Sequence, residues 1–267
     1  MKNRVFLKLG GSLITDKSVP HKARIEIIRA LAGEIRLALQ SLPEMQLLVG
    51  HGSGSFGHVP ANKFHTRSGV RSADEWKGFA QVWYEARALN QIVTEQFADA
   101  GLPVISLPPS AAAIATDGKV SQWDFTPIQA AFEHGLVPII QGDVIFDTIR
   151  GGTILSTEEL FCHLAGVLHP DLILIGGSED GVWEDYPKRT HLLARITPAE
   201  YPEIAQKIFP SGAVDVTGGM ASKVAAMVDL VRAQPELRVI IFNPTKSGSL
   251  TAAFDARTTG TMICSQR

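Results

Sequence analysis

Cysteine and positive charge are both scarce in this 267-residue chain. Its two cysteines, Cys162 and Cys264, are far apart and lack CxxC spacing, so neither a disulfide framework nor a cysteine zinc site is expected. We assign them no chemistry. The 25 basic residues are outnumbered by 27 acidic ones, which gives a formal net charge of −2. A broad basic face for nucleic acid is therefore not expected, any anion site must be local, and the expected partner is a small molecule.

Long hydrophobic runs are also absent. The apolar stretch at residues 5–7 is too short for the hydrophobic region of a signal peptide or for a membrane span. We therefore expect no membrane partner and a cytoplasmic location. Hydrophobic residues still make up 45% of the chain, which is enough to bury a large core in one big domain or in two lobes.

Strand and helix patterns alternate along the chain. Short runs rich in valine, isoleucine and leucine predict strands at 5–9, 46–49, 103–106, 137–141, 172–175 and 238–242. Helical patterns fall between most of them, at 22–40, 73–100, 127–133, 157–168, 198–208 and 220–233. This order predicts an α/β fold, a three-layer αβα sandwich with a mostly parallel central sheet. A turn at 168–171 divides it into an N-terminal lobe, residues 1–169, and a C-terminal lobe, residues 170–267, of one continuous domain.

Two glycine loops follow the first two predicted strands. The first is Lys8-Leu9-Gly10-Gly11-Ser12, and the second runs from His51 to His58 as HGSGSFGH. Glycine lets backbone N–H groups approach an anion closely, and Lys8 and His58 add positive charge. The pair therefore indicates a phosphotransferase.

The second loop also matches the GxGxxG pattern of dinucleotide-binding proteins. That reading needs an acidic residue at the end of a second strand about 20 positions on, whereas Asp74 and Glu75 open a helix here. Pro60 and a polar run also stand where the phosphate-binding helix should continue. We therefore set the oxidoreductase reading aside. A Walker A motif is absent, which argues against a P-loop kinase but not against kinase chemistry in another fold.

A third glycine element precedes the predicted helix at 220–233. Gly218 and Gly219 come directly before it, and Lys223 lies on its first turn. Two glycines at a helix N-terminus expose N–H groups and the positive end of the helix dipole, which suits a polyphosphate. A plain N-terminal turn is the alternative.

These three elements together resemble the amino acid kinase superfamily over essentially the whole chain. Within it, the SFGH ending of the second loop, Lys17 after Thr15-Asp16, and Gly142-Asp143 most resemble the isopentenyl phosphate kinases. That branch phosphorylates a monophosphate rather than a carboxylate.

The resemblance implies ATP as donor, Mg²⁺ held mainly by ATP, and no nucleophilic side chain. Lys8 would reach the transferring phosphate, Lys17 would stabilise the transition state, and His58 would bind the acceptor phosphate. The expected ATP-binding residues are Lys8, Leu9, Gly10, Gly11, Ser12, Gly54, Ser178, Gly218, Gly219 and Lys223. The expected acceptor-binding residues are Ser53, Gly57, His58, Thr157, Phe79, Val82 and Trp83. No metal-binding side chain and a homodimer are expected.

His58 carries the argument about the acceptor. An imidazole with a pKa of about 6.5 can protonate beside a phosphate monoester and donate to it. An acceptor that already bears negative charge repels the γ-phosphate of ATP, and a cationic donor offsets that repulsion. The alternative is that His58 caps a loop or binds backbone, and we give His51 and His65 such a structural role.

Three positions depart from the family pattern. Ser53 stands where a glycine is usual, and Ser156-Thr157-Glu158-Glu159 stands where Ser-Gly-Asp-Asp is expected. Thr157 keeps an N–H there and adds a hydroxyl, and Glu158 could orient the lysines. Ser178 replaces an aspartate, which puts an adenosine contact in doubt.

An apolar stripe on the long helix after the histidine loop has the spacing of a buried face: Phe79, Val82, Trp83, Ala86 and Leu89. Such a stripe is usually core. By resemblance, Phe79, Val82 and Trp83 would also border an isoprenoid pocket and face Ile145. We therefore expect ATP-dependent phosphorylation of isopentenyl phosphate. The alternatives are a kinase for a phosphonate, as in the fosfomycin-resistance relatives, and a nucleotide-binding sensor without activity.

Overall fold

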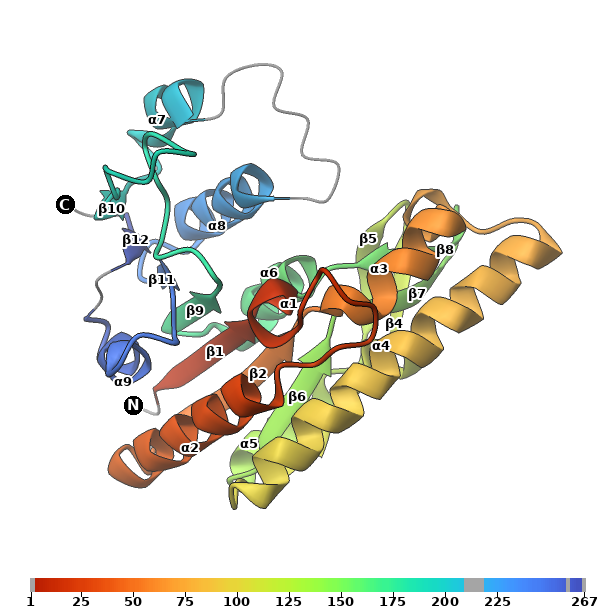
Figure 1. Cartoon of the computed structure of the whole chain (residues 1–267), viewed down its shortest axis with the longest axis horizontal. Coiled ribbons are helices and arrows are strands. Elements are labelled where there is room, and N and C mark those ends of the chain that lie inside the picture. Colours follow the sequence, from red (N-terminus) through yellow and green to blue (C-terminus); the bar gives the residue numbers. More distant parts are fainter. Residues whose placement is uncertain (1–2, 209–218, 258–259, 266–267) are drawn as a thin grey trace.

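The computed structural model describes residues 3–208, 219–257 and 260–265 (Figure 1). Its main sheet has eight strands in the order β10-β12-β11-β9-β1-β2-β6-β3. The six predicted strands are confirmed within this sheet, as β1 (Arg4–Leu9), β2 (Gln46–His51), β3 (Val104–Ser106), β6 (Val137–Gln141), β9 (Leu172–Gly176) and β11 (Arg238–Phe242). Neighbouring strands are parallel except β11 and β12 (Thr261–Ile263), and β10 (Arg195–Ile196) ends the sheet. The sheet thus takes strands from both sides of residue 169.

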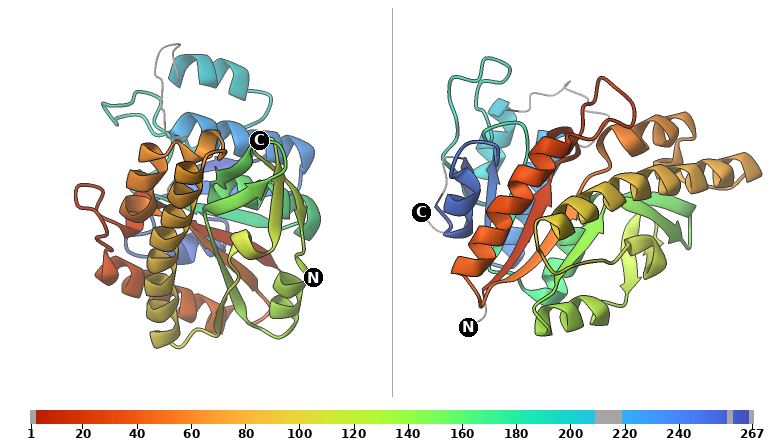
Figure 2. Two further views of the ribbon diagram at one scale, coloured as in Figure 1. Left: turned by 90° about the vertical axis from the view of Figure 1, so that its right-hand side faces the viewer. Right: turned by 60° about the horizontal axis from the view of Figure 1, so that its bottom comes forward.

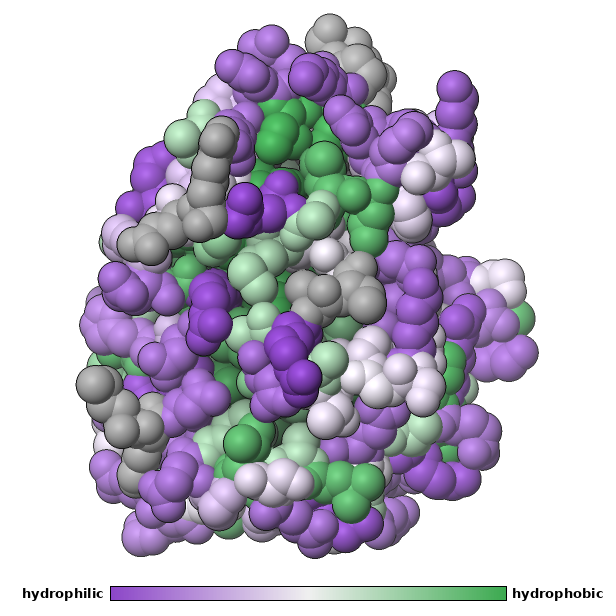
Figure 3. Space-filling model, turned by 90° about the vertical axis from the view of Figure 1, so that its left-hand side faces the viewer, coloured by the Kyte–Doolittle hydropathy of each residue, from purple (hydrophilic) through white to green (hydrophobic). Residues whose placement is uncertain are grey.

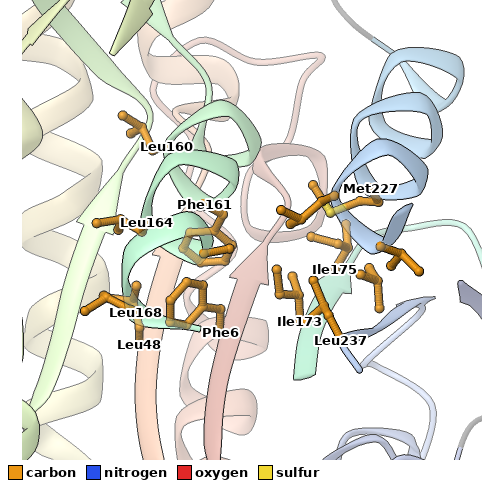
Figure 4. Close-up of a cluster of buried hydrophobic side chains, with 14 of the residues drawn as sticks. Phe6, Leu48, Leu160, Phe161, Leu164, Leu168, Ile173, Ile175, Met227 and Leu237 are labelled. Atoms are coloured by element: carbon orange, nitrogen blue, oxygen red, sulfur yellow. The ribbon is translucent and has the colours of Figure 1, made fainter. Parts of the chain in front are cut away.

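Helices cover both faces of this sheet, as the alternation in β1 illustrates. Val5, Leu7 and Leu9 lie in one buried cluster with α2 (Ile25–Ser41), α4 (Ala73–Asp99) and α9 (Ser249–Phe254). Phe6 points to the opposite face, among α5 (Thr126–Glu133), α6 (Thr157–Leu168) and α8 (Met220–Ala233). Figure 4 shows Phe6 and Leu48 against α6, with Met227 of α8 over Ile175. The three-layer αβα sandwich is confirmed, and the two further views in Figure 2 show its layers.

A second sheet was not predicted. It has four strands in the order β5-β4-β7-β8, with bounds β4 (Ala113–Thr116), β5 (Lys119–Trp123), β7 (Asp143–Asp147) and β8 (Gly151–Leu155). These strands mix small, polar and apolar residues, so none forms the continuous apolar run that marks a buried parallel strand. β7 follows β6 after a single residue, Gly142, so the chain passes directly from one sheet to the other.

The remaining helices lie mainly at the loops. They are α1 (Gly11–Ile14), α3 (Gly54–Lys63), α7 (Tyr201–Ile208) and two 3-10 turns at Thr66–Ser68 and Pro109–Ala111. The expectation that Pro60 prevents a helix after the second glycine loop is wrong, because α3 runs through Pro60 to Lys63. Proline has a helical φ and costs one hydrogen bond, and the Pro60 side chain is itself buried against the protein.

In the part of the chain that the structure describes, no helix is long and apolar enough to cross a membrane. On the face that carries α7 and the C-terminal strands, hydrophobic residues are visible between hydrophilic ones (Figure 3).

Candidate active site

The two glycine loops meet at the carboxyl ends of β1 and β2. A Cβ at Gly11 would lie 2.5 Å from the backbone nitrogen of Gly54 and 2.7 Å from its Cα, so only glycine fits there. Gly54 itself has a φ of +52°, and a Cβ there would collide with Thr15. Gly10 is similarly close to the carbonyl of Gly176 at the end of β9. The carboxyl ends of parallel strands are where ligands bind in open α/β sheets.

Lys8 lies next to these loops on the face of β1 that α6 covers. Its side chain is buried and forms an ion pair with Glu158 in the first turn of α6. The Nζ atom of Lys223, on α8, lies 3.8 Å from the same Glu158 carboxylate. One carboxylate therefore joins two lysines that are far apart in the sequence.

The charges of this cluster affect one another. Burial lowers the pKa of Lys8, which the Glu158 carboxylate partly opposes. Burial alone would raise the pKa of Glu158, but the fields of Lys8 and Lys223 bring it below its ordinary value. Glu158 is thus ionised at neutral pH and holds Lys8 and Lys223 beside the glycine loops. The sequence had suggested this role for Glu158 only through its place in the family pattern.

Lys17 and His58 are exposed at the same edge. Protein atoms around the imidazole desolvate it in part although the residue reaches the surface, and this desolvation and the charge of Lys17 both lower the pKa of His58 below its ordinary value. The expectation that this imidazole titrates near 6.5 is therefore corrected for the chain without ligand, in which His58 is neutral at pH 7. Lys17 is also close enough to contribute to the lowered pKa of Lys8.

Thr157 and Ser53 flank the second glycine loop. The Thr157 hydroxyl donates to the carbonyl of His51 at 2.7 Å and is buried. The Thr157 hydroxyl, which we expected near the acceptor phosphate, is therefore occupied by this hydrogen bond within the protein. The backbone N–H of Thr157 at the start of α6 can still donate to the acceptor phosphate. Ser53 precedes α3, and its Oγ would be 2.9 Å from a Cβ at Gly57, so these two residues are packed together.

His51 has the structural role that we expected. It is fully buried at the end of β2, and its Nε2 lies 3.0 Å from Oδ1 of Asn90. Its carbonyl accepts from the N–H of Gly142 at 3.0 Å. His65 is exposed.

Three of the expected ATP-binding residues lie at the ends of β1, β9 and α8. Leu9 is buried in the core, so only its backbone faces the loops, where its carbonyl accepts from Gly52 at 3.1 Å. Ser178 is exposed just beyond β9, and its carbonyl accepts from Asn243 at 3.4 Å. Gly219 is the N-cap of α8. Gly218 lies outside the described residues, and Ser12 lies in the first turn of α1.

The apolar stripe of α4 divides into an inner and an outer part. Phe79 and Val82 are buried with Val70 and Val144 in a small cluster against which Trp76 packs. Trp83 is 38% exposed and lies under the guanidinium of Arg87. Trp83 is therefore at the margin of this cluster.

The expectation that the stripe faces Ile145 is wrong. Val144 is the β7 residue in the cluster with Phe79, whereas Ile145 belongs to the large cluster on the other face. Successive strand residues point to opposite faces, so an assignment off by one residue selects the wrong side chain.

The arrangement suits the transfer of a phosphoryl group. Two glycine loops in contact, the N-terminal ends of α3, α6 and α8, and three lysines concentrate N–H donors and positive charge at one edge of the sheet. Phosphoryl transfer requires such placement and charge stabilisation, with little covalent work from the protein. The fold and the site therefore define a phosphotransferase of the αβα class.

Comparison with known proteins agrees with this class. A sequence model of the amino acid kinase family matches residues 3–243, and the chain belongs to that family.

Several relatives carry a more specific name. Isopentenyl phosphate kinase from Methanocaldococcus jannaschii is 30% identical over 264 residues, which cover 97% of each chain. The enzyme of that name from Methanothermobacter thermautotrophicus is 31% identical over 88% of this chain and 90% of its own length. A crystal structure of isopentenyl phosphate kinase superposes with a TM-score of 0.81 at 29% identity, covering 98% of this chain and all of the other. The resemblance that the sequence motifs indicated is confirmed.

Proposed function

We propose that this protein transfers the γ-phosphate of ATP to isopentenyl phosphate and so forms isopentenyl diphosphate and ADP. The observation that carries the proposal is the contact between the two glycine loops, with Lys8 and Lys223 gathered on Glu158 beside them. Relatives of the same length that bear this name, and a solved structure described as a product complex from Thermoplasma acidophilum, support the choice of substrate.

The donor side is the first glycine loop together with α8. Gly11 and the N-terminus of α8 present N–H groups to the phosphates of ATP, and Lys223 adds charge. The N–H of Gly10 donates to the carbonyl of Gly176 at 2.8 Å and so fixes the loop to the end of β9. Lys8 reaches the phosphoryl group in transfer. As that group moves, negative charge spreads over its equatorial oxygens, and preorganised lysines stabilise this charge without rearrangement.

The acceptor side is the second glycine loop with His58. The acceptor phosphate lies against Ser53, Gly57 and the N–H of Thr157, and His58 takes up a proton when this dianion arrives. The positive charge of Lys17, which lowers the pKa of His58, stabilises the negative charge that develops on the phosphoryl group between donor and acceptor. The oxygen of the acceptor phosphate attacks the γ-phosphorus in line, and ADP leaves.

Mg²⁺ enters with the nucleotide in this proposal. Among residues 3–208, 219–257 and 260–265, no three His, Cys, Asp or Glu side chains are placed to hold a metal, and Glu158 is already paired with lysines. Magnesium often binds through substrate phosphates and water, which fits a site rich in lysine. When bound, it neutralises charge on the phosphates.

The cluster of Phe79, Val82 and Val144 is proposed to border the hydrocarbon tail, with Trp83 at its margin. At about 0.8 kcal/mol per buried CH₂, a five-carbon tail contributes only a few kcal/mol. The phosphate contacts therefore anchor the acceptor, and the apolar residues limit the length of its tail.

We also propose the division of labour, assembly and location that the sequence suggested. Residues 1–169 bind the acceptor, residues 170–267 bind most of the nucleotide, and the protein works as a cytoplasmic homodimer.

The test is an acceptor screen that measures ADP release from Mg-ATP by the purified chain. Isopentenyl phosphate, the phosphonate fosfomycin and a carboxylate such as N-acetylglutamate are compared at equal concentrations. We expect the highest kcat/KM with isopentenyl phosphate and a diphosphate product by phosphorus NMR. A preference for the phosphonate or the carboxylate would contradict the proposal, and ATP binding with no ADP release from any acceptor would indicate a sensor.

A further inference from the structure

Thr15 lies between the two glycine loops and touches both. It follows α1, is 0% exposed and was not among the residues to which the sequence assigned a role. Its hydroxyl donates to the carbonyl of Gly11 in the first loop at 2.6 Å. The same hydroxyl accepts from the N–H of Ser55 in the second loop at 3.0 Å. One buried oxygen therefore joins the donor loop to the acceptor loop.

The segment that starts at Thr15 continues this connection. The N–H of His21 donates to the carbonyl of Ser55 at 3.3 Å, so both backbone groups of Ser55 are bound by this segment. The imidazole of His21 packs edge-on against Phe56 with ring centres 5.4 Å apart. In Figure 1 the chain between α1 and α2 passes alongside α3. Lys17 lies between these two attachment points.

We propose that Thr15 is a positioning residue that sets the spacing between the donor and acceptor phosphates and the placement of Lys17. The inference rests on the proposed function. A hydroxyl can donate once and accept, which is what a junction between a carbonyl and an N–H requires. No hydrocarbon side chain can do this. Because in-line transfer depends on the approach of the two reacting atoms, a shift of about 1 Å between the loops can cost about 100-fold in rate.

The test uses Thr15→Val and Thr15→Ser. Valine keeps the shape and removes the hydroxyl, whereas serine keeps the hydroxyl. We expect Thr15→Val to lower kcat by about 30-fold, with the Kd of ATP and the KM of isopentenyl phosphate within about threefold of native, since each loop still binds its own ligand. Thr15→Ser should retain kcat within about threefold. A loss confined to kcat distinguishes spacing from the loss of either binding site.

Thr261 provides the matched control. It is also 0% exposed, and its hydroxyl donates to the carbonyl of Leu193 at 2.6 Å and accepts from the N–H of Val182 at 2.8 Å. It joins β12 to the segments around Val182 and Leu193 and makes no hydrogen bond to either glycine loop. Thr261→Val should lower the melting temperature as Thr15→Val does and leave kcat at saturating ATP within about twofold of native.

The outcomes separate the two proposals. A native chain without turnover overturns the proposed function. Native turnover with an unchanged kcat in Thr15→Val, or with an equal fall in Thr261→Val, overturns the positioning role of Thr15 alone. If Thr15→Val does not fold, Thr15→Cys replaces it, because a thiol is a weaker donor and acceptor and should give the same loss confined to kcat.

Discussion

At the scale of single residues, the site depends on charges that the fold brings together. Glu158 forms ion pairs with Lys8 and Lys223, and the charge of Lys17 lowers the pKa of His58. The lysines and His58 were found from the sequence because they belong to motifs near glycines. Their coupling through Glu158 was indicated only by the family pattern, because the contact joins side chains on β1, α6 and α8 that are far apart in the chain.

His58 provides a prediction about protons. Its pKa lies below the ordinary value in the free protein, so it is neutral at pH 7, and a phosphate dianion beside it should raise that pKa. Binding of isopentenyl phosphate at pH 7 should therefore take up protons. Calorimetry in two buffers with different ionisation enthalpies measures this uptake. It should shrink in His58→Ala, which should also raise KM or lower kcat at least about 10-fold while the Kd of ATP stays near native. Equal uptake in both proteins would contradict the role of His58.

Glu158 provides a prediction about stability and rate together. Glu158→Gln leaves two lysines without their carboxylate, one of them buried, and should cost about 3 to 5 kcal/mol in the free energy of unfolding. It should also lower kcat. Glu159→Gln is the control, since Glu159 is half-exposed and a glutamine still serves the capping box at the start of α6. Urea unfolding and initial rates measure both effects, and similar stability in the two variants would contradict the role of Glu158.

The pH dependence of this pair follows from the sign of the shift. The folded pKa of Glu158 lies below its ordinary value of 4.5, so the ionised carboxylate stabilises the fold above pH 4.5. That contribution is lost as the pH falls through the lower, folded value. Glu158→Gln should therefore lose less stability than the native chain over this acid range.

At the scale of elements, the two glycine loops are close enough that their backbones are in contact. The Gly11→Ala variant places a Cβ 2.5 Å from the backbone of Gly54 and should lower kcat by about 100-fold or more, because the loops must separate. Gly33→Ala is its control. Nothing lies within 4 Å of a Cβ at Gly33 inside α2, so this variant should gain about 0.5 to 1 kcal/mol of stability with native kcat. Steady-state rates measure kcat and thermal unfolding measures stability in both variants. A native kcat in Gly11→Ala would contradict the need for close contact between the two glycine loops.

Helix α4 provides a prediction about the acceptor tail. Phe79 is 7% exposed and contacts Trp76 and Phe146, whereas Trp83 is 38% exposed. Phe79→Ala should open the pocket and raise kcat/KM for ten-carbon relative to five-carbon prenyl phosphates, with a stability cost of about 3 to 5 kcal/mol. Trp83→Ala should change this ratio less. The comparison is made by competition between the two substrates, and a larger effect from Trp83→Ala would place that residue, not Phe79, at the end of the tail.

At the scale of the whole molecule, the assembly is the open prediction. Large apolar side chains remain exposed on the surface of this chain, among them Tyr84 at 65% and Ile149 at 66%. If a second copy covers such side chains, light scattering at micromolar concentration should give twice the mass of one chain. A mass of one chain across the concentration range would contradict the homodimer.

Six parallel strands of the central sheet, its main helices, the three glycine elements and the family all follow from the amino-acid sequence alone. These features arise from local patterns, because buried parallel strands are continuous apolar runs and anion-binding loops need glycine next to a strand or helix end. The four-stranded second sheet was not predicted because its strands lack such apolar runs.

Which residues act together is visible only in the folded protein. It placed Val144 rather than Ile145 beside Phe79, used the Thr157 hydroxyl inside the protein, and joined the glycine loops through Thr15. Each of these depends on which face a side chain occupies or on a contact between distant segments. Such contacts are set by the packing of sheets and helices against one another, and no local pattern in the chain records them.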